Sequence, residues 1–216
     1  MITDIVPRQG IIFALPHPDP AACAYHVAFS SDGAAMALKS TVFKFQLQIA
    51  DMDRHYYADH VLTLARHPSE TDQRLVARVL AFARQADERL SMASALCEPD
   101  EPDLCLTRLD GRIEHWIDVG QPEARRIIKA AGRADRVTVH PYAGSSSQLW
   151  WQGAQRELTR LRTLAVIAFP EAEVKALAAT VARTTAWQVM VQDGVLMVSG
   201  EHGCVSVEPD TWRAIA

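Results

Sequence analysis

Polar residues alternate with Val, Phe and Ile over residues 40–51, and this period of two predicts a β-strand. The turn-like sequence of residues 51–54 follows, and residues 55–66 predict a strand that returns beside the first. His67-Pro68-Ser69 then ends the segment. The chain is therefore expected to begin its fold with a long β-hairpin.

A helical period replaces the alternation after Ser69. Apolar residues recur at a spacing of three to four up to about Leu90, which predicts an amphipathic helix with Arg74, Arg78 and Arg84 outside its apolar stripe. Ser69 followed by Asp72 has the form of a capping box, so the helix is expected to begin there.

The second half of the chain alternates between the two patterns. Asp110-Gly111 between apolar segments 104–109 and 112–119 predicts a second hairpin. Gln121-Pro122 is expected to open a helix that Gly132 closes. The pattern continues with a strand over 136–142, a helix from 144, a strand over 164–169, a helix over 171–183 and a hairpin that turns at residues 193–194. This order predicts an α/β domain with a mixed β-sheet flanked by helices.

Residues 1–35 lack any periodic apolar pattern and contain four prolines. They also lack the positive start and continuous apolar centre of a secretory signal. We expect this segment to be a disordered extension or an upstream start of the reading frame, with Met36 as the natural start and residues 36–216 as a single domain.

Composition narrows the class of protein. A chain of 216 residues with 49% hydrophobic residues can bury one core or two small ones. The net charge of −4 argues against a generally basic nucleic-acid coat, although a local basic patch is compatible with it. The four cysteines form no CxxC pair, which indicates a reduced, cytoplasmic protein, and no apolar run approaches the roughly 18–20 residues of a membrane span.

Two carboxylates stand out because the hairpin brings their strands together. Asp103 follows Pro102 just before the first strand, and Asp118 lies at the end of the second. Carboxylates on adjacent strands can hold Mg²⁺ through oxygen, with Mn²⁺ as a substitute. Glu70 or Asp72 could approach from the preceding helix.

Each of these residues also has a structural interpretation. Asp103 could cap a turn, Asp118 could be a solvent-facing loop residue, and Glu70 or Asp72 could cap the helix. The cations of the helix before Gly132 could form a solvated face. Only the joint occurrence of the acids favours a metal centre.

The order of these elements and acids resembles metal-dependent nucleases of the PD-(D/E)xK kind. More specifically, the chain resembles the YaeQ family in ALKSTVFK (37–44), DMDRHYY (51–57), LTLARHPSETD (62–72), EPDL (101–104) and WIDVGQP (116–122). KAAGR (129–133) and Trp150-Trp151 extend the resemblance, which runs from Met36 to about Val207. It implies a bacterial protein with a PD-(D/E)xK, restriction-endonuclease-like core and added N- and C-terminal β segments.

The chain departs from the nuclease motif where lysine is expected. The position two residues after Asp118 is Gly120, so Gln121 or Lys129 would have to replace the lysine. Two functions follow. The first is a Mg²⁺-dependent phosphodiesterase acting on DNA or RNA, with Glu70 as an auxiliary acid. The second is a catalytically inactive, nuclease-derived module that binds nucleic acid or has a regulatory role.

Overall fold

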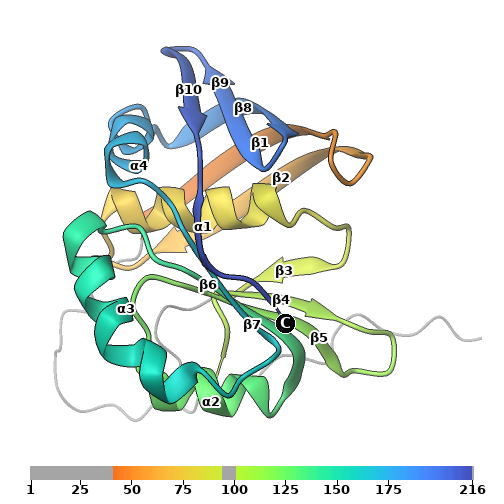
Figure 1. The fold of residues 1–216 in the computed structure, drawn as a ribbon. Helices are drawn as coiled ribbons and strands as arrows, with labels where there is room; N and C mark the ends of the chain where they lie inside the picture. The colour runs from red at the N-terminus through yellow and green to blue at the C-terminus, as the bar shows by residue number, and fades with distance from the viewer. Residues whose placement is uncertain (1–40, 94–100, 216) are drawn as a thin grey trace, which may run out of the picture. The chain divides into compact units, whose positions relative to one another are not determined.

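The computed structural model describes residues 41–93 and 101–215, all within the unit Leu38–Ala216. The predicted extension 1–35 lies outside the described residues. Two sheets and four helices make up the described fold (Figure 1). The helices are α1 (Asp72–Arg84), α2 (Ala124–Ala131), α3 (Gly144–Leu158) and α4 (Glu171–Ala178).

The first sheet has the strand order β10-β9-β8-β1-β2. Its strands are β1 (Thr41–Asp51), β2 (Tyr56–Arg66), β8 (Thr184–Gln192), β9 (Val195–Gly200) and β10 (Gly203–Val207). The predicted hairpins β1–β2 and β8–β9 are both present, and Asp193 and Gly194 both have positive φ, as a two-residue turn between strands requires. Parallel pairing of β1 with β8 joins the two hairpins into one sheet.

The second sheet has the strand order β11-β7-β6-β5-β4-β3. Its strands are β3 (Leu90–Met92), β4 (Leu104–Thr107), β5 (Ile113–Val119), β6 (Ala134–His140), β7 (Leu164–Ala168) and β11 (Asp210–Arg213). The predicted β4–β5 hairpin is present, and β5, β6 and β7 are parallel. The expectation of a single mixed sheet is therefore wrong, because the N- and C-terminal β segments pair with each other.

Helix α1 lies between the two sheets, as Figure 1 shows. Nine of its 13 residues are buried, and the eight apolar ones form one core with the inner face of the first sheet and with β4 and β5. A second core lies on the other face of the second sheet, where α2 and α3 cover it through residues such as Ile127 and Leu158. Strand β5 is consequently buried on both faces, with Ile117 in the first core and Trp116 in the second.

The helix boundaries differ from those predicted. The cap of α1 is Thr71, whose Oγ1 accepts from the Arg74 amide, so the capping box at Ser69 is wrong. The helix also ends at Arg84, and α2 begins at Ala124, two residues after Pro122. Gly132 closes α2 as predicted. No helix among the described residues is long and apolar enough to cross a membrane.

Candidate active site

Asp103 and Asp118 lie side by side at one end of the second sheet. Leu104 pairs with Ile117 in the antiparallel β4–β5 register, so the next positions outward are Asp103 and Asp118. Both residues line a pocket of about 300 Å³, which we call the acid pocket. Its lining residues are Arg74, Ala93, Glu101, Pro102, Asp103, Asp118, Val119, Gln121, Pro122 and Arg126.

Asp118 is held by the first turn of α2. The carboxylate is buried on the same face of β5 as Trp116, and Arg126 donates to both of its oxygens at 2.9 and 3.1 Å. Arg126 also donates to the carbonyl oxygen of Glu101 at 2.6 Å, and its guanidinium lies 5.9 Å from the centre of the Trp116 ring. The interpretation of Asp118 as a solvent-facing loop residue is therefore wrong.

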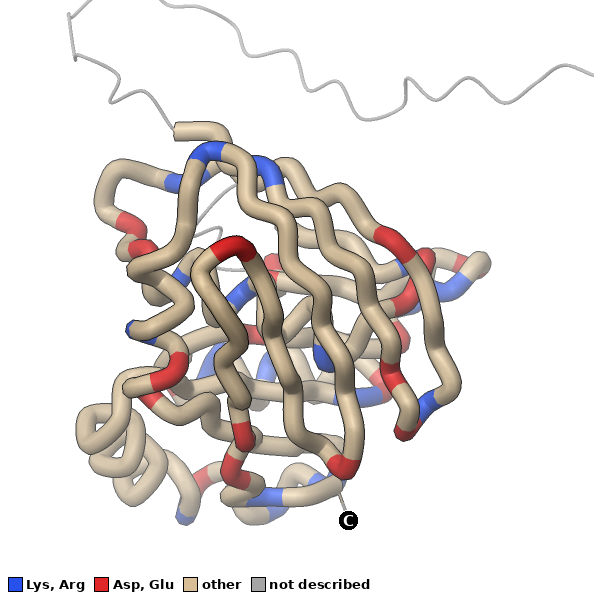
Figure 2. The backbone as a smooth tube through the Cα atoms, turned by 90° about the horizontal axis from the view of Figure 1, so that it is seen from above, with Lys and Arg blue, Asp and Glu red and all other residues tan. Residues whose placement is uncertain are grey.

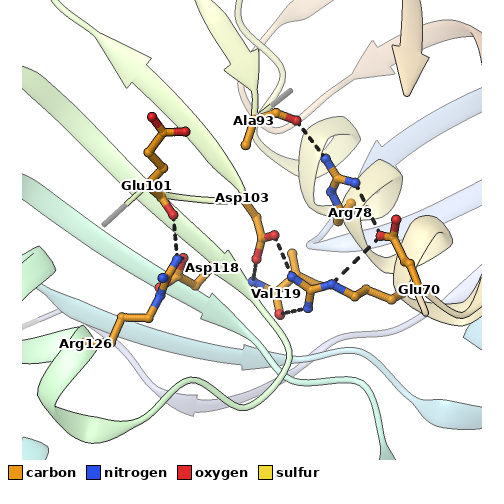
Figure 3. A network of polar contacts seen from close by, with 9 residues as sticks. Glu70, Arg78, Ala93, Glu101, Asp103, Asp118, Val119 and Arg126 are labelled. Carbon is orange, nitrogen blue, oxygen red and sulfur yellow. Dashed lines mark hydrogen bonds and ion pairs between the residues drawn. The ribbon is translucent and has the colours of Figure 1, made fainter. Parts of the chain in front are cut away.

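Asp103 is held by α1 and by the end of β5, as Figure 3 shows. One oxygen accepts from Arg74 Nη2 at 2.7 Å, and the other accepts from the Val119 amide at 2.7 Å. Arg74 also donates to the Val119 carbonyl oxygen at 2.6 Å, so both polar groups of that backbone unit are bonded. Burial raises the pKa of Asp103, and the positive charge of Arg74 and the Val119 N–H partly offset this rise.

Glu70 and Asp72, the two candidates near the first helix, are not among the residues that line the acid pocket. Glu70 is buried, and Arg78 donates to one of its oxygens at 3.3 Å. Arg78 also donates to the Ala93 carbonyl oxygen at 3.1 Å. Burial raises the pKa of Glu70, against the lowering effect of Arg78. Asp72 forms an ion pair with Arg66. Both acids therefore have an arginine partner that does not line the acid pocket, and one oxygen of Glu70 has no partner among the described residues.

The two candidates for the place of the missing lysine have different positions. Gln121 lines the acid pocket, where its amide donates to the Ser146 and Ser147 hydroxyls at 3.1 Å each. Lys129 is exposed in the last turn of α2 and is not among the lining residues. Arg126, one turn earlier, lines the pocket instead.

The roles of Arg74, Arg126 and Glu101 were missed from the sequence. The Asp118–Arg126 pair joins a strand to the helix that follows it, and the apolar period gives the buried side of that helix without the strand residue that a neighbouring arginine reaches. Arg74 lies outside the predicted apolar stripe, but no carboxylate partner could be assigned to it from the sequence. A signal was available in the three-residue spacing of Arg126 and Lys129, which puts both on one side of α2.

The chemistry of the pocket suits a hard divalent cation. The lining residues have a formal charge of −1, from Glu101, Asp103 and Asp118 against Arg74 and Arg126. Only the two aspartate carboxylates face each other, because the Glu101 side chain points away and its backbone carbonyl accepts from Arg126 (Figure 3). Within the described residues each oxygen of Asp103 and Asp118 accepts one hydrogen bond and has a second lone pair for a further ligand. No group of three His, Cys, Asp or Glu side chains in the described ranges could hold a metal by itself. Water would have to complete the coordination, as is usual for Mg²⁺.

Comparison with known proteins finds one family. The family model described as YaeQ protein matches residues 36–209. The YaeQ proteins of Escherichia coli K12 and Salmonella typhi are 38% and 36% identical to the chain over 178 residues, which are 82% of this chain and 98% of each relative. The names of these relatives assign no activity.

Two crystal structures of YaeQ proteins have the same fold. The protein from Xanthomonas axonopodis pv. citri matches with a TM-score of 0.78 and 42% identity, over 82% of this chain and 99% of that one. The protein from Pseudomonas syringae matches with a TM-score of 0.78 and 33% identity, over 81% and 97%.

Proposed function

The chain belongs to the YaeQ family, and on this premise we propose that it is a Mg²⁺-dependent phosphodiesterase that cuts DNA or RNA at the acid pocket. The observation that carries the proposal is the convergence of Asp103, Asp118 and Gln121 on one pocket. These residues come from two strand ends and the following loop. The cytoplasmic location that the cysteines predict is part of this proposal.

The order of elements around the pocket supports a core of the PD-(D/E)xK kind. Helix α1 comes first, followed by Pro102-Asp103 at the start of β4 and by Asp118 near the end of β5. Helix α2 and the parallel strand β6 complete the unit. The added hairpins lie in the other sheet, so they leave this order intact.

Each polar residue of the pocket has a role in this proposal. Asp103 and Asp118 would hold the cation with one carboxylate each. When bound, a divalent cation polarises the phosphodiester and lowers the pKa of a coordinated water. Gln121 is held by Ser146 and Ser147 and would orient the attacking water through its amide.

Arginine replaces lysine as the source of positive charge. Arg74 and Arg126 line the pocket, and a guanidinium stays protonated at all relevant pH values, so neither can transfer a proton. Their contribution is to neutralise the negative charge that develops on the phosphoryl oxygens.

We predict Mg²⁺- or Mn²⁺-dependent cleavage of labelled DNA or RNA oligonucleotides by the purified chain. Asp103→Asn and Asp118→Asn should each lower the rate at least about 100-fold, the scale of loss expected when one preorganised electrostatic group is removed. Asp59→Asn is the matched control, because Asp59 is exposed on β2 and its side chain is outside the acid pocket. Equal rates for all three variants would refute the proposal.

One observation favours the second function, an inactive nuclease-derived module. Arg126 bonds both oxygens of Asp118, and Arg74 bonds Asp103, so a cation must compete with two guanidiniums for the carboxylates. If the wild-type chain binds nucleic acid and cuts neither DNA nor RNA with either metal, the module is the correct account.

A further inference from the structure

Positive charge is concentrated in the part of the chain that covers the outer face of the second sheet. The stretch 123–162, which contains α2 and α3, has eight Lys and Arg residues and three Asp and Glu residues. Its formal charge is therefore +5, in a chain whose total is −4. The strands β8, β9 and β10 of the other sheet contain no charged residue, as Figure 2 shows.

Five arginines of this stretch are exposed and have no carboxylate within ion-pair distance among the described residues. They are Arg125, Arg136, Arg156, Arg160 and Arg162. Arg136 alternates along β6 with Val137, which packs against α2 and α3, so Arg136 lies on the other face of the sheet. We call the remaining four arginines the basic surface. Elsewhere in the fold Arg54, Arg66 and Arg89 each pair with an aspartate, whereas Arg112 and Arg183 are exposed without an ion pair among the described residues. Exposed cations without counter-charges repel one another, and a bound polyanion would relieve this repulsion.

The sheet register shows that part of the basic surface is continuous. Strands β6 and β7 are parallel, with Val137 beside Leu164, and the Val137 amide donates to the Thr163 carbonyl oxygen at 2.9 Å. Arg162 immediately precedes Thr163, so it lies beside β6 at the end of the sheet where β6 begins. Arg160 is two residues earlier on the same connection.

Helix α2 links this end of the sheet to the acid pocket. Arg126 in its first turn lines the pocket, and its last residue, Ala131, leads to the start of β6. Eight residues at 1.5 Å each make α2 about 12 Å long, a distance that one strand of B-DNA covers in about four nucleotides. A backbone that lies along α2 would therefore run from the pocket towards the start of β6, beside which Arg162 lies.

We propose that the basic surface binds the sugar–phosphate backbone of a nucleic acid that runs along α2 into the acid pocket. The identity of the partner rests on the proposed function. An anionic membrane is the competing partner, but an interfacial helix needs its apolar face free. The apolar side of α2 is occupied, since Ile127 and Ala130 are buried against the second sheet.

The test is the affinity of the full chain for a fluorescein-labelled 20-nucleotide DNA, measured by anisotropy in EDTA between about 50 and 200 mM salt. EDTA removes the divalent cation, so binding is measured independently of cleavage. Arg160→Glu/Arg162→Glu should weaken binding about tenfold or more and should make the slope of log K against log salt shallower by about two. The milder Arg160→Ala/Arg162→Ala should change both quantities in the same direction.

The matched control is Lys44→Glu/Lys175→Glu, which changes the net charge by the same amount. Lys44 is exposed on β1, and Lys175 is exposed on α4, which packs against α1 and β10. This variant should bind within about twofold of wild type, since it leaves the phosphate contacts intact. Equal weakening of both charge-reversal variants would overturn the proposal.

The remaining outcomes separate this proposal from the proposed function. The proposal that the basic surface binds nucleic acid would be overturned if the wild type bound neither the DNA nor an RNA of the same sequence. Binding only to phosphatidylglycerol vesicles would overturn it as well. Cleavage that persists unchanged in Arg160→Glu/Arg162→Glu would overturn it too and would leave the phosphodiesterase standing. Binding that depends on the two arginines in a chain that never cuts would support the surface and refute the enzyme.

Discussion

At the scale of single residues, the pair of Glu70 and Arg78 is the most buried of the ion pairs in the described chain. The two side chains are 1% and 2% exposed. One oxygen of Glu70 and the Nε of Arg78 have no partner among the described residues. A pair of this kind has a large desolvation cost, and removing one partner leaves an uncompensated buried charge.

We predict that Arg78→Met lowers the free energy of unfolding by about 3 kcal/mol, because Glu70 then loses its hydrogen-bonded cation and keeps only Arg74 Nε, 3.9 Å away. The double variant Glu70→Leu/Arg78→Met should recover much of this loss, since no buried charge remains. Urea unfolding of the two single variants and the double variant measures the coupling. A double variant as unstable as the sum of the single ones would contradict the interpretation.

The sequence predicted the carboxylates of the pocket better than the cations. Asp103 and Asp118 could be paired because an Asp-Gly turn fixes the hairpin between them, and Gln121 follows Asp118 closely. Arg126 could not be paired with Asp118, because the apolar pattern gives the buried side of α2 but not the strand residue that a side chain beside that stripe reaches. Whether these residues carry a reaction stays a prediction.

At the scale of elements, His140 joins three of them. It lies at the end of β6, and its Nδ1 donates to the Ile167 carbonyl oxygen on β7 at 2.9 Å. Its Nε2 accepts at 3.1 Å from the side-chain amide of Gln85, the residue that follows α1. The ring stacks on Phe169. Burial lowers the pKa of His140 to about 3, so the histidine stays neutral in the folded chain.

This pKa makes stability depend on pH. The unfolded chain binds a proton at His140 near pH 6.5, whereas the folded chain binds it only near pH 3. The free energy of unfolding therefore falls as the pH decreases through this window. Between pH 7 and pH 5 the wild type should lose about 2 kcal/mol more than His140→Gln. Urea unfolding at the two pH values measures the difference. His115, whose pKa burial also lowers to about 3, remains in both proteins and cancels. Equal losses would show that His140 does not titrate as described.

Turns and helix ends show how far local sequence determines the elements. The Asp-Gly turns at residues 110–111 and 193–194 were predicted correctly, because glycine there adopts positive φ in a short connection. The start of α1 was predicted incorrectly because Ser69 and Thr71 are both good caps. Burial of Glu70 against Arg78 is a tertiary contact, and it places Glu70 outside the helix that Thr71 then caps.

At the scale of the whole described fold, the parallel pairing of β1 with β8 is the contact that creates two sheets. It joins residues about 140 positions apart, such as Lys44 and Thr184. Apolar periodicity gives the faces of each strand but not its partner, so the sequence predicted the longer strands and the α/β class, without the short strands β3 and β11 and without the division into sheets. The same division explains why α1 is buried on nearly all sides.

The central claim is that Asp103 and Asp118 hold a divalent cation together in the acid pocket. Anomalous diffraction from crystals soaked in Mn²⁺ tests it most directly. We predict an anomalous peak within about 2.5 Å of oxygens from both carboxylates, and its loss in crystals of Asp118→Asn. The absence of a peak from the acid pocket of the wild-type crystal would contradict the claim.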